Sequence, residues 1–467
     1  MKRFIKYTGI LILTVLLLGS CEKWIDPEIN IDPDNPAEVS LATLMPAIQA
    51  RMAFNAVGGN DLVRTQAIWM QQLDGVIRQS LAEANYQLRS SDVNNLWNSN
   101  YAGSMMDIKT LIDQANASDP VALHFSGAGK IMMAIALMQT TDVWGDIPYT
   151  EAFQGKENIA PAFESQQQIY QTIMTLLEEG VNELGQTDES PTPLDGDFLY
   201  GGDTEMWIKA GYAYMAKAAL HLSKVNPSTA YSDAMGYLDN AIQSADEDMQ
   251  FNYGSANTEA NPLYQFMRDR GDVRMGQYFV EMLKARQDPR LAVFVAPDGN
   301  GEYTGSAPGS GNADASEPGP AIAGATAPTY FATYMEMLLI KAECQYETGV
   351  DEATVKETLL MALEESLNKY GVFNQDYIDG YEQQWLSTLS GEDLKKEIIT
   401  QKYISLCYQS EVYNDFRRTD NIMGIDPNPN GFENEIPRRF PYSTDELTYN
   451  GNVPSGVTIM DRVWWDQ

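Results

Sequence analysis

The sequence predicts a mostly α-helical protein, and three observations support this fold class. Apolar residues recur at helical spacing over most of the chain between residues 41 and 409. Hydrophobic residues make up 44% of the 467 residues, which is enough for a large core. Two pairs of the helical segments carry the small and aromatic residues of closely packed helix hairpins. We therefore expect one helical domain over residues 41–467.

The N-terminal segment predicts a lipid anchor. A basic head at residues 2–6 precedes an apolar run from Ile10 to Leu18, which is too short to span a bilayer because spanning takes roughly 20 apolar residues. The small pair Gly19-Ser20 then leads to Cys21. Leu18 to Cys21 is similar to a bacterial lipoprotein cleavage site, so we expect a signal peptide over residues 1–20 and acylation of Cys21. The alternative is an ordinary signal peptide followed by a chance cysteine.

The helices are expected in a regular order after a short tether. Residues 21–40 contain three prolines and predict an extended tether. The expected helices span residues 41–57, 61–73, 93–115, 121–141, 166–184, 204–225, 228–245, 277–286, 330–348, 352–370 and 393–409. Asp203 and Asp351 are expected N-caps, and Gly349 is an expected helix stop. The segment 296–328 is rich in Gly, Ala, Ser and Pro and predicts a long surface loop.

One helix pair carries a repeat signature. Residues 207–214, WIKAGYAY, match the tetratricopeptide pattern W-x2-L-G-x2-Y with Ala210 in place of Leu, and Ala234 and Leu238 match the partner helix. A second pair, over 338–347 and 354–365, is a degenerate version. A generic helix hairpin is the alternative. Arrays of helix pairs usually bind another protein, so this pattern favours a binding function.

Charge and motifs predict neither a nucleic-acid partner nor a cofactor. The formal net charge is −34, which makes nucleic acid and anionic membrane surfaces poor partners. His124 and His221 lie in helical segments among apolar neighbours and are expected to pack. The motifs HExxH and GxSxG are absent, and GAGK at 127–130 lacks the rest of a phosphate loop. We predict no catalytic residue, although a glycosidase carboxylate pair stays open because 65 acidic residues create close pairs by chance.

The sequence predicts neither a metal site nor a disulfide. The residues 426–431, DPNPNG, begin like an EF-hand loop, but Pro437 stands where a bidentate Glu should close it. We expect a turn-rich loop and predict no metal site, with a weak structural cation as the alternative. Cys344 and Cys407 are expected to be buried free thiols, and one disulfide between them is the alternative.

The order of motifs resembles the SusD/RagB family of outer-membrane lipoproteins, and its SusD-like branch in particular. The segments that carry the resemblance are CEKWIDPEINIDPDNP (21–36), LWNSNYAGSMMDI (96–108), TDVWGDIPYTEAF (141–153), GGDTEMWIKAGYAYMAKAAL (201–220), DPRL (288–291), LLIKAECQYETG (338–349), IITQKYISLCYQSEVYNDFRRT (398–419) and IPRRFPYSTDELTYN (436–450). They cover the chain after the leader. Trp97, Tyr101, Trp207 and Arg417 stand in these segments and are expected to pack, not to contact a ligand.

The resemblance implies both a fold and a function. It implies four tetratricopeptide-like helix pairs on one side and irregular, loop-rich structure on the other. It also implies a surface-exposed, lipid-anchored outer-membrane protein that partners a SusC-like TonB-dependent transporter and takes up an oligosaccharide or a peptide. Two further classes of protein stay open, a glycan-degrading enzyme and a surface adhesin.

Three loop segments outside these motifs combine aromatic and polar residues, as a weak ligand site requires. They are residues 75–90, residues 261–272 and the loop 296–328. The candidate ligand contacts within them are Arg78, Asn85, Tyr86, Tyr264, Arg268, Asp269, Arg270 and Tyr303. Neighbouring arginines would suit an acidic sugar or a peptide carboxylate, because the guanidinium fork binds such groups in a bidentate manner. The alternative for each segment is a solvated loop or a capped turn.

Overall fold

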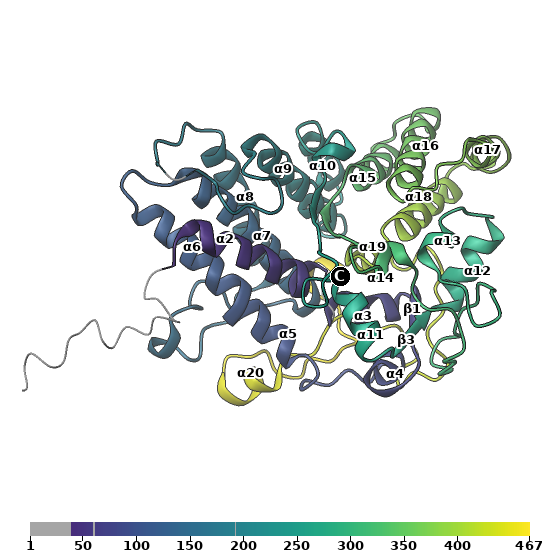
Figure 1. Cartoon of the computed structure of the whole chain (residues 1–467), viewed down its shortest axis with the longest axis horizontal. Coiled ribbons are helices and arrows are strands. Elements are labelled where there is room, and N and C mark those ends of the chain that lie inside the picture. Colours follow the sequence, from purple (N-terminus) through teal and green to yellow (C-terminus); the bar gives the residue numbers. More distant parts are fainter. Residues whose placement is uncertain (1–38, 59–60, 192) are drawn as a thin grey trace, which may run out of the picture.

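Amphipathic and buried helices make up most of the described chain, which confirms the predicted fold class (Figure 1). The computed structural model describes residues 39–58, 61–191 and 193–467. The expected signal peptide, Cys21 and the tether up to residue 38 lie outside the described residues. Within the described part of the chain, no helix is both long enough and apolar enough to cross a membrane.

The α-helices range from the 4 residues of α13 to the 22 residues of α7. The helices of the first half are α2 (Leu41–Arg51), α3 (Leu62–Trp69), α4 (Arg78–Ala84), α5 (Asn94–Asn98), α6 (Met106–Ala117), α7 (Leu123–Trp144), α8 (Gln166–Leu184), α9 (Thr204–His221) and α10 (Ala230–Leu238). Those of the second half are α11 (Pro262–Asp269), α12 (Gln277–Ala285), α13 (Leu291–Phe294), α14 (Pro320–Ala323), α15 (Tyr334–Glu347), α16 (Glu352–Lys369), α17 (Gln375–Gly380), α18 (Glu392–Ser405), α19 (Glu411–Arg418) and α20 (Thr444–Tyr449). Three π-helical segments, η2 (Met52–Val57), η3 (Ser99–Met105) and η6 (Tyr381–Trp385), join neighbouring helices.

The long helices form a continuous array along one side of the molecule. Helices α6, α7, α8, α9 and α10 pack each against the next, and α10 then contacts α15, which packs on α16 and α18 (Figure 1). The pairs α9–α10 and α15–α16 are the two hairpins that the sequence predicts. The expected caps are confirmed: Asp203 accepts hydrogen bonds from the amides of Glu205 and Met206, and Asp351 accepts one from Thr354. Gly349 ends α15 with a φ of 76°.

Two small antiparallel sheets tie the loop-rich side together. In one, β1 (Leu73–Gly75) pairs with β3 (Val273–Met275); in the other, β2 (Met249–Phe251) pairs with β4 (Thr329–Ala332). The sequence does not predict these strands or the short helices α4, α11, α17, α19 and α20, because each is too short for a periodic pattern to stand out. The expected helix 330–348 begins at Tyr334 instead, because residues 329–332 form β4 and Thr333 caps the helix.

The core confirms most packing predictions. Trp97, Trp207 and Arg417 are buried, at 2%, 0% and 0% exposure, and Trp97 stacks on Tyr101 with ring centroids 4.7 Å apart. Arg417 lies over the ring of Trp465, 4.4 Å from its centroid. Cys344 and Cys407 are buried free thiols, as expected, and burial raises the pKa of each well above its ordinary value.

Candidate ligand-binding site

The first two candidate segments lie side by side because β1 pairs with β3. Leu73 pairs with Met275 and Gly75 with Val273, so α4, which follows β1, and α11, which precedes β3, flank the same two-stranded sheet (Figure 1). Asn261 accepts hydrogen bonds from the amides of Leu263 and Tyr264 and fixes the start of α11. The chain turns tightly after β1, and a Cβ at Gly75 would lie 1.7 Å from the carbonyl oxygen of Ser80.

The loop 296–328 packs onto this sheet and is firmly bonded to it. The Ser306 amide donates to the Met275 carbonyl at 2.8 Å, and the Met275 amide donates to the Ser316 carbonyl at 2.8 Å. Buried Asp74 accepts a hydrogen bond from the Ser306 hydroxyl at 2.5 Å and another from the Gly309 amide at 3.0 Å. Burial raises the pKa of the Asp74 carboxyl to about 6, although these two hydrogen bonds oppose the rise. The fold therefore brings all three candidate segments to one face.

Two of the candidate arginines share one buried carboxylate. A guanidinium nitrogen of Arg78 lies 2.9 Å from one oxygen of Asp272, and Arg270 donates two hydrogen bonds to the other oxygen, at 3.0 and 2.9 Å. The Asp272 side chain is fully buried, whereas those of Arg78 and Arg270 are 56% and 41% exposed. One positive charge is left over at the surface, and the outer edges of the two guanidinium groups face solvent. This arrangement suits a carboxylate or a polar oxygen of a ligand.

Tyr86 does not offer a ring to a ligand. It ends the turn after α4 with a φ of 60°, and its ring is only 4% exposed because the loop at Gly431 covers it. The Tyr86 hydroxyl accepts a hydrogen bond from the Asn428 amide at 2.7 Å, and burial raises the pKa of Tyr86 to about 12. The expected stacking role of Tyr86 is therefore corrected to a packing role. Asn85 is its neighbour, and its side-chain oxygen accepts a hydrogen bond from the Asn428 amide group at 3.0 Å.

The loop 426–431, which begins like an EF-hand, thus forms a turn that packs against the end of α4. Asn428, at its centre, is 4% exposed and also donates to the Ala84 carbonyl at 2.6 Å. Among the described residues, no group of three or more His, Cys, Asp or Glu side chains is placed to hold a metal ion. The turn-rich interpretation of residues 426–431 is confirmed.

The remaining candidates lie on α11 and in the loop 296–328. Tyr264 on α11 and Tyr303 in the loop are half-buried, and Tyr303 packs partly against the core. Arg268 donates two hydrogen bonds to the carboxylate of its exposed neighbour Asp269, at 2.7 and 2.8 Å, so the charges of this pair cancel locally. An open hollow of about 550 Å³ adjoins β3, lined by Arg274, Ala296, Pro297, Asp298, Gly299, Asn300, Ala313, Asp314, Ala315 and Glu317. Its walls are polar and contain no aromatic ring.

Comparison with known proteins places the chain in a family. The sequence model of a SusD-like family, described as starch-binding and associating with the outer membrane, matches residues 33–443. This chain belongs to the SusD-like family. The predicted resemblance is therefore confirmed over most of the chain. The description of the family places nutrient binding and outer-membrane association at the family level.

Solved structures share the fold of this SusD-like protein. A SusD/RagB family protein from Bacteroides thetaiotaomicron is 23% identical, with a TM-score of 0.79, covering 92% of this chain and 99% of that one. A chitin-binding protein is also 23% identical, with a TM-score of 0.77 and coverage of 92% and 100%. A chitin-binding SusD homologue from Flavobacterium johnsoniae is 20% identical, with a TM-score of 0.77 and coverage of 91% and 99%. A search of curated proteins gave no significant match.

The SusD-like chain also has a solvent-facing tryptophan that lies outside the three candidate segments. Trp385, at the end of η6, is 46% exposed and borders an open hollow of about 410 Å³ between α12 and α17. Its segment lies between two expected helices, and the sequence reasoning missed it. The signal is present in YEQQW at 381–385, because aromatic and polar residues occur together there as in the three candidate segments.

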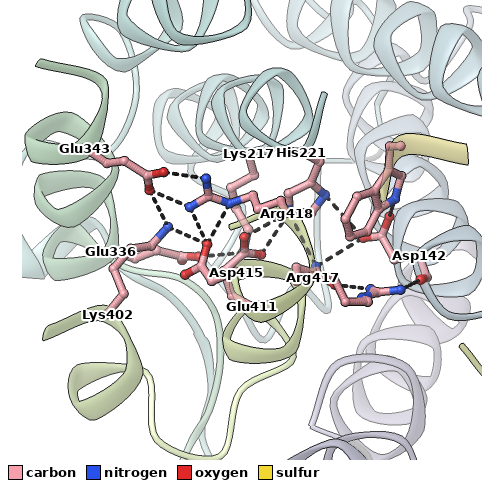
Figure 2. Close-up of polar contacts among 12 residues, drawn as sticks. Asp142, Lys217, His221, Glu336, Glu343, Lys402, Glu411, Asp415, Arg417 and Arg418 are labelled. Atoms are coloured by element: carbon pink, nitrogen blue, oxygen red, sulfur yellow. Dashed lines mark hydrogen bonds and ion pairs between the residues drawn. The ribbon is translucent and has the colours of Figure 1, made fainter. Parts of the chain in front are cut away.

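A large group of charged side chains lies inside the helical array, but it is buried and has a structural role. Figure 2 shows how they contact one another between α7, α9, α15, α18 and α19. Its labelled members are Asp142, Lys217, His221, Glu336, Glu343, Lys402, Glu411, Asp415, Arg417 and Arg418, and each is at most 5% exposed. We call this set the buried ionic network. Five acids face five potential cations, so the opposite charges are equal in number and every member is buried.

The contacts within the network are close and multiple. Lys402 lies 3.1 Å from Glu343 and 2.8 Å from Asp415, and Arg418 contacts both of these carboxylates. Burial alone would raise the pKa of Glu343, but Arg418 and Lys402 outweigh it and lower that pKa to about 2. Glu343 therefore remains charged at neutral pH.

His221 is packed, as expected, but it is also charged. It lies 2.9 Å from Glu411 and 3.3 Å from Asp142. Burial opposes its protonation, but the two carboxylates outweigh burial and raise the pKa of His221 from 6.5 to about 9. The other histidine, His124, is half-buried and contacts the Gln186 carbonyl at 3.0 Å.

The His221 charge predicts a loss of stability in alkaline solution. Because the folded state raises this pKa, the stabilisation is complete below pH 6.5 and disappears as the pH rises through about 9. The charged form of His221 stabilises the folded state by about 3 kcal/mol in total, because each pKa unit corresponds to about 1.36 kcal/mol. We expect the free energy of unfolding, measured with urea, to fall more between pH 6.5 and 9.5 in the wild type than in His221→Gln. Equal losses in the two proteins would contradict the assignment of a charged His221.

Proposed function

We propose that this SusD-like protein is a surface-exposed outer-membrane lipoprotein that binds oligosaccharide and delivers it to a SusC-like TonB-dependent transporter. The observation that carries the proposal is the family match over residues 33–443, because the family is described as starch-binding and associated with the outer membrane. The lipoprotein-like segment from Leu18 to Cys21 supports the anchored location. The loop face around β1 and β3 supports the capture role, since the strand pairing brings α4 and α11 together and Arg78 and Arg270 meet there at Asp272.

A peptide cargo is the second candidate, and one observation favours it. Arg78 and Arg270 converge on Asp272 with their outer edges in solvent, and a peptide carboxylate would fit these donors. The two cargoes differ in their response to salt, because an ion pair at an exposed site weakens with ionic strength whereas ring stacking does not.

The experiment that tests the function uses the full chain, extracted in mild detergent from cells that also express the transporter. Binding is measured by affinity electrophoresis through gels containing soluble starch or a soluble chitin derivative, and by titration with acidic peptides at low and high salt. We expect retardation by at least one glycan and co-elution of the transporter. Binding of acidic peptides alone would replace the glycan proposal with the peptide one. Absence of both the transporter and any ligand would contradict the function.

The anchor proposal predicts the behaviour of Cys21→Ala. No other residue supplies a thiol at the expected cleavage site, so this variant should not be acylated. One acyl chain binds a bilayer only weakly, but several on one residue hold a protein firmly. We expect the wild type in the membrane pellet and the variant in the soluble fraction after detergent-free lysis. Retention of the variant in the pellet would show that something other than Cys21 holds the chain there.

The loop-face proposal predicts weaker binding for the double variant Tyr264→Ala, Tyr303→Ala. Each aromatic contact contributes on the order of 1 kcal/mol, so loss of both rings should weaken ligand binding at least about tenfold. Tyr86 is left unchanged because its ring is buried. Circular dichroism checks the fold, and Tyr449→Ala, which removes a 74% exposed ring from the end of α20, is the control. Unchanged binding in a folded double variant would exclude this face as the site.

A further inference from the structure

A second hollow, lined by none of the candidate ligand residues, has the features of a built binding surface. It lies between α12, α17 and η6 and has a volume of about 410 Å³. Helices α12 and α17 are at the right-hand end of the molecule in Figure 1. The residues that line it are Ala285, Arg286, Gln287, Asp376, Tyr377, Gly380, Tyr381, Gln384 and Trp385. Trp385 is 46% exposed, the one tryptophan among the described residues to face solvent openly. Its volume lies within the range of roughly 300–1,000 Å³ that is typical of small-molecule sites.

One buried carboxylate holds the groups that line this hollow. Glu397 of α18 is 3% exposed. Its oxygens accept hydrogen bonds from the Trp385 indole at 3.2 Å and from the Tyr381 hydroxyl at 2.9 Å. Arg286 donates two more to the same carboxylate, both at 2.8 Å, and its guanidinium lies 5.0 Å from the centroid of the Trp385 ring. The indole therefore has a fixed orientation while nearly half of its surface stays open.

A neighbouring ring is fixed in the same way. The Tyr377 hydroxyl donates to Asp288 at 3.2 Å, and Asp288 is itself held by the buried Arg290 at 2.6 Å. Tyr377 and Tyr381 are 6.5 Å apart between ring centroids, with their planes inclined by 30°. Tyr381 is only 6% exposed and supports the partly exposed Tyr377. A ring held like Tyr377 loses little conformational entropy when a ligand stacks on it, which favours binding.

The chemistry of the hollow selects a neutral, hydroxyl-rich ligand. The charge of Arg286 is already compensated by Glu397, so the hollow has no spare positive charge to attract an anion. Gln287, Gln384 and Asp376 stand at the rim and offer donors and acceptors for hydroxyl groups. A sugar presents C–H groups to a flat ring and hydroxyl groups around its edge. A protein helix would instead need a continuous apolar groove, and the polar rim does not provide one.

We propose that this hollow is a second carbohydrate-binding site, with Trp385 as its stacking platform and neutral oligosaccharide as its ligand. The proposal rests on the glycan cargo proposed above and adds a site that is separate from the loop face at β1 and β3. Two weak sites on one protein would hold a long glycan at two points, because the second contact forms at a high effective concentration.

The test follows Trp385 directly in the full chain in detergent. The protein is labelled with 5-fluorotryptophan, and Trp385→Phe assigns the fluorine resonance of residue 385. Maltoheptaose and chitohexaose are the probes, and affinity electrophoresis on soluble starch and a soluble chitin derivative gives the affinities. We expect the 385 resonance to shift on glycan addition. Trp385→Ala should weaken binding about tenfold, Trp385→Phe should keep most of it, and Tyr449→Ala should change nothing.

The remaining outcomes separate this inference from the proposed function. Glycan binding by the wild type with an unmoved 385 resonance, and full binding by Trp385→Ala, would overturn the second site and leave the function in place. Loss of transporter co-elution in Trp385→Ala without loss of glycan binding would also overturn it, because the hollow would then be a protein contact. Absence of any glycan binding by the wild type would overturn both proposals together.

Discussion

Replacement of Arg418 by methionine should lower the free energy of unfolding by about 3–5 kcal/mol. Arg418 is 4% exposed and contacts Glu343 and Asp415, so its loss leaves two buried carboxylates with Lys402 as their remaining close cation. The low dielectric of the interior makes such an uncompensated charge costly. Urea unfolding followed by circular dichroism at pH 7 measures the change.

Arg462→Met is the matched control for this prediction. Arg462 also pairs with acids, lying 2.8 Å from exposed Asp420 and 3.3 Å from buried Asp466, but its own side chain is 42% exposed. Both acids keep a contact with Lys224 when Arg462 is replaced, so no buried carboxylate is left without a cation. Exposed ion pairs contribute less than about 1 kcal/mol, so this control should unfold close to the wild type. A loss of stability in Arg418→Met no larger than that in Arg462→Met would show that the buried ionic network does not hold the helical array together.

The same network explains how far the sequence could predict the fold. Helical spacing and the caps at Asp203 and Asp351 are local signals, so the long helices could be located from them. The network joins Lys217 on α9 to Glu336 on α15 at 2.7 Å, across more than a hundred residues of sequence. A lysine in a mostly apolar helix predicts a surface position by itself. Only the packed helical array shows that Lys217 and its carboxylate partner Glu336 are both buried.

The sequence likewise predicts only part of the candidate site, because local composition locates its segments but contacts between distant residues decide which side chains are exposed. The rule of combined aromatic and polar residues selected three segments that the β1–β3 pairing brings to one face. It could not distinguish Tyr86, whose ring is covered through contacts with Asn428 and Gly431, from a ring that is free to stack. The rule would have selected Trp385 had it been applied to residues 371–392. Exposure of a ring depends on partners that are distant in sequence, so composition alone cannot supply it.

Gly75→Ala should destabilise the protein by about 3 kcal/mol or more, at the upper end of the cost of overpacking. A Cβ at this position would lie 1.7 Å from the Ser80 carbonyl oxygen and 2.8 Å from the Leu81 amide nitrogen. Both are backbone atoms, so no side-chain rotation can relieve the clash, and α4 has to move away from β1. Differential scanning calorimetry measures the loss. Gly236→Ala on α10, whose Cβ would meet nothing within 4 Å, is the control and should gain about 0.5–1 kcal/mol.

The same substitution connects the turn to the binding face. If α4 moves, Arg78 leaves Asp272 and the turn at Tyr86 loses its seat on Asn428. Ligand binding through the loop face should therefore weaken in whatever fraction of Gly75→Ala remains folded, whereas the hollow at Trp385 should be unaffected because its support comes from Glu397 of α18. A Gly75→Ala protein with the melting temperature and the ligand affinity of Gly236→Ala would show that the tight turn after β1 has no role in positioning the site.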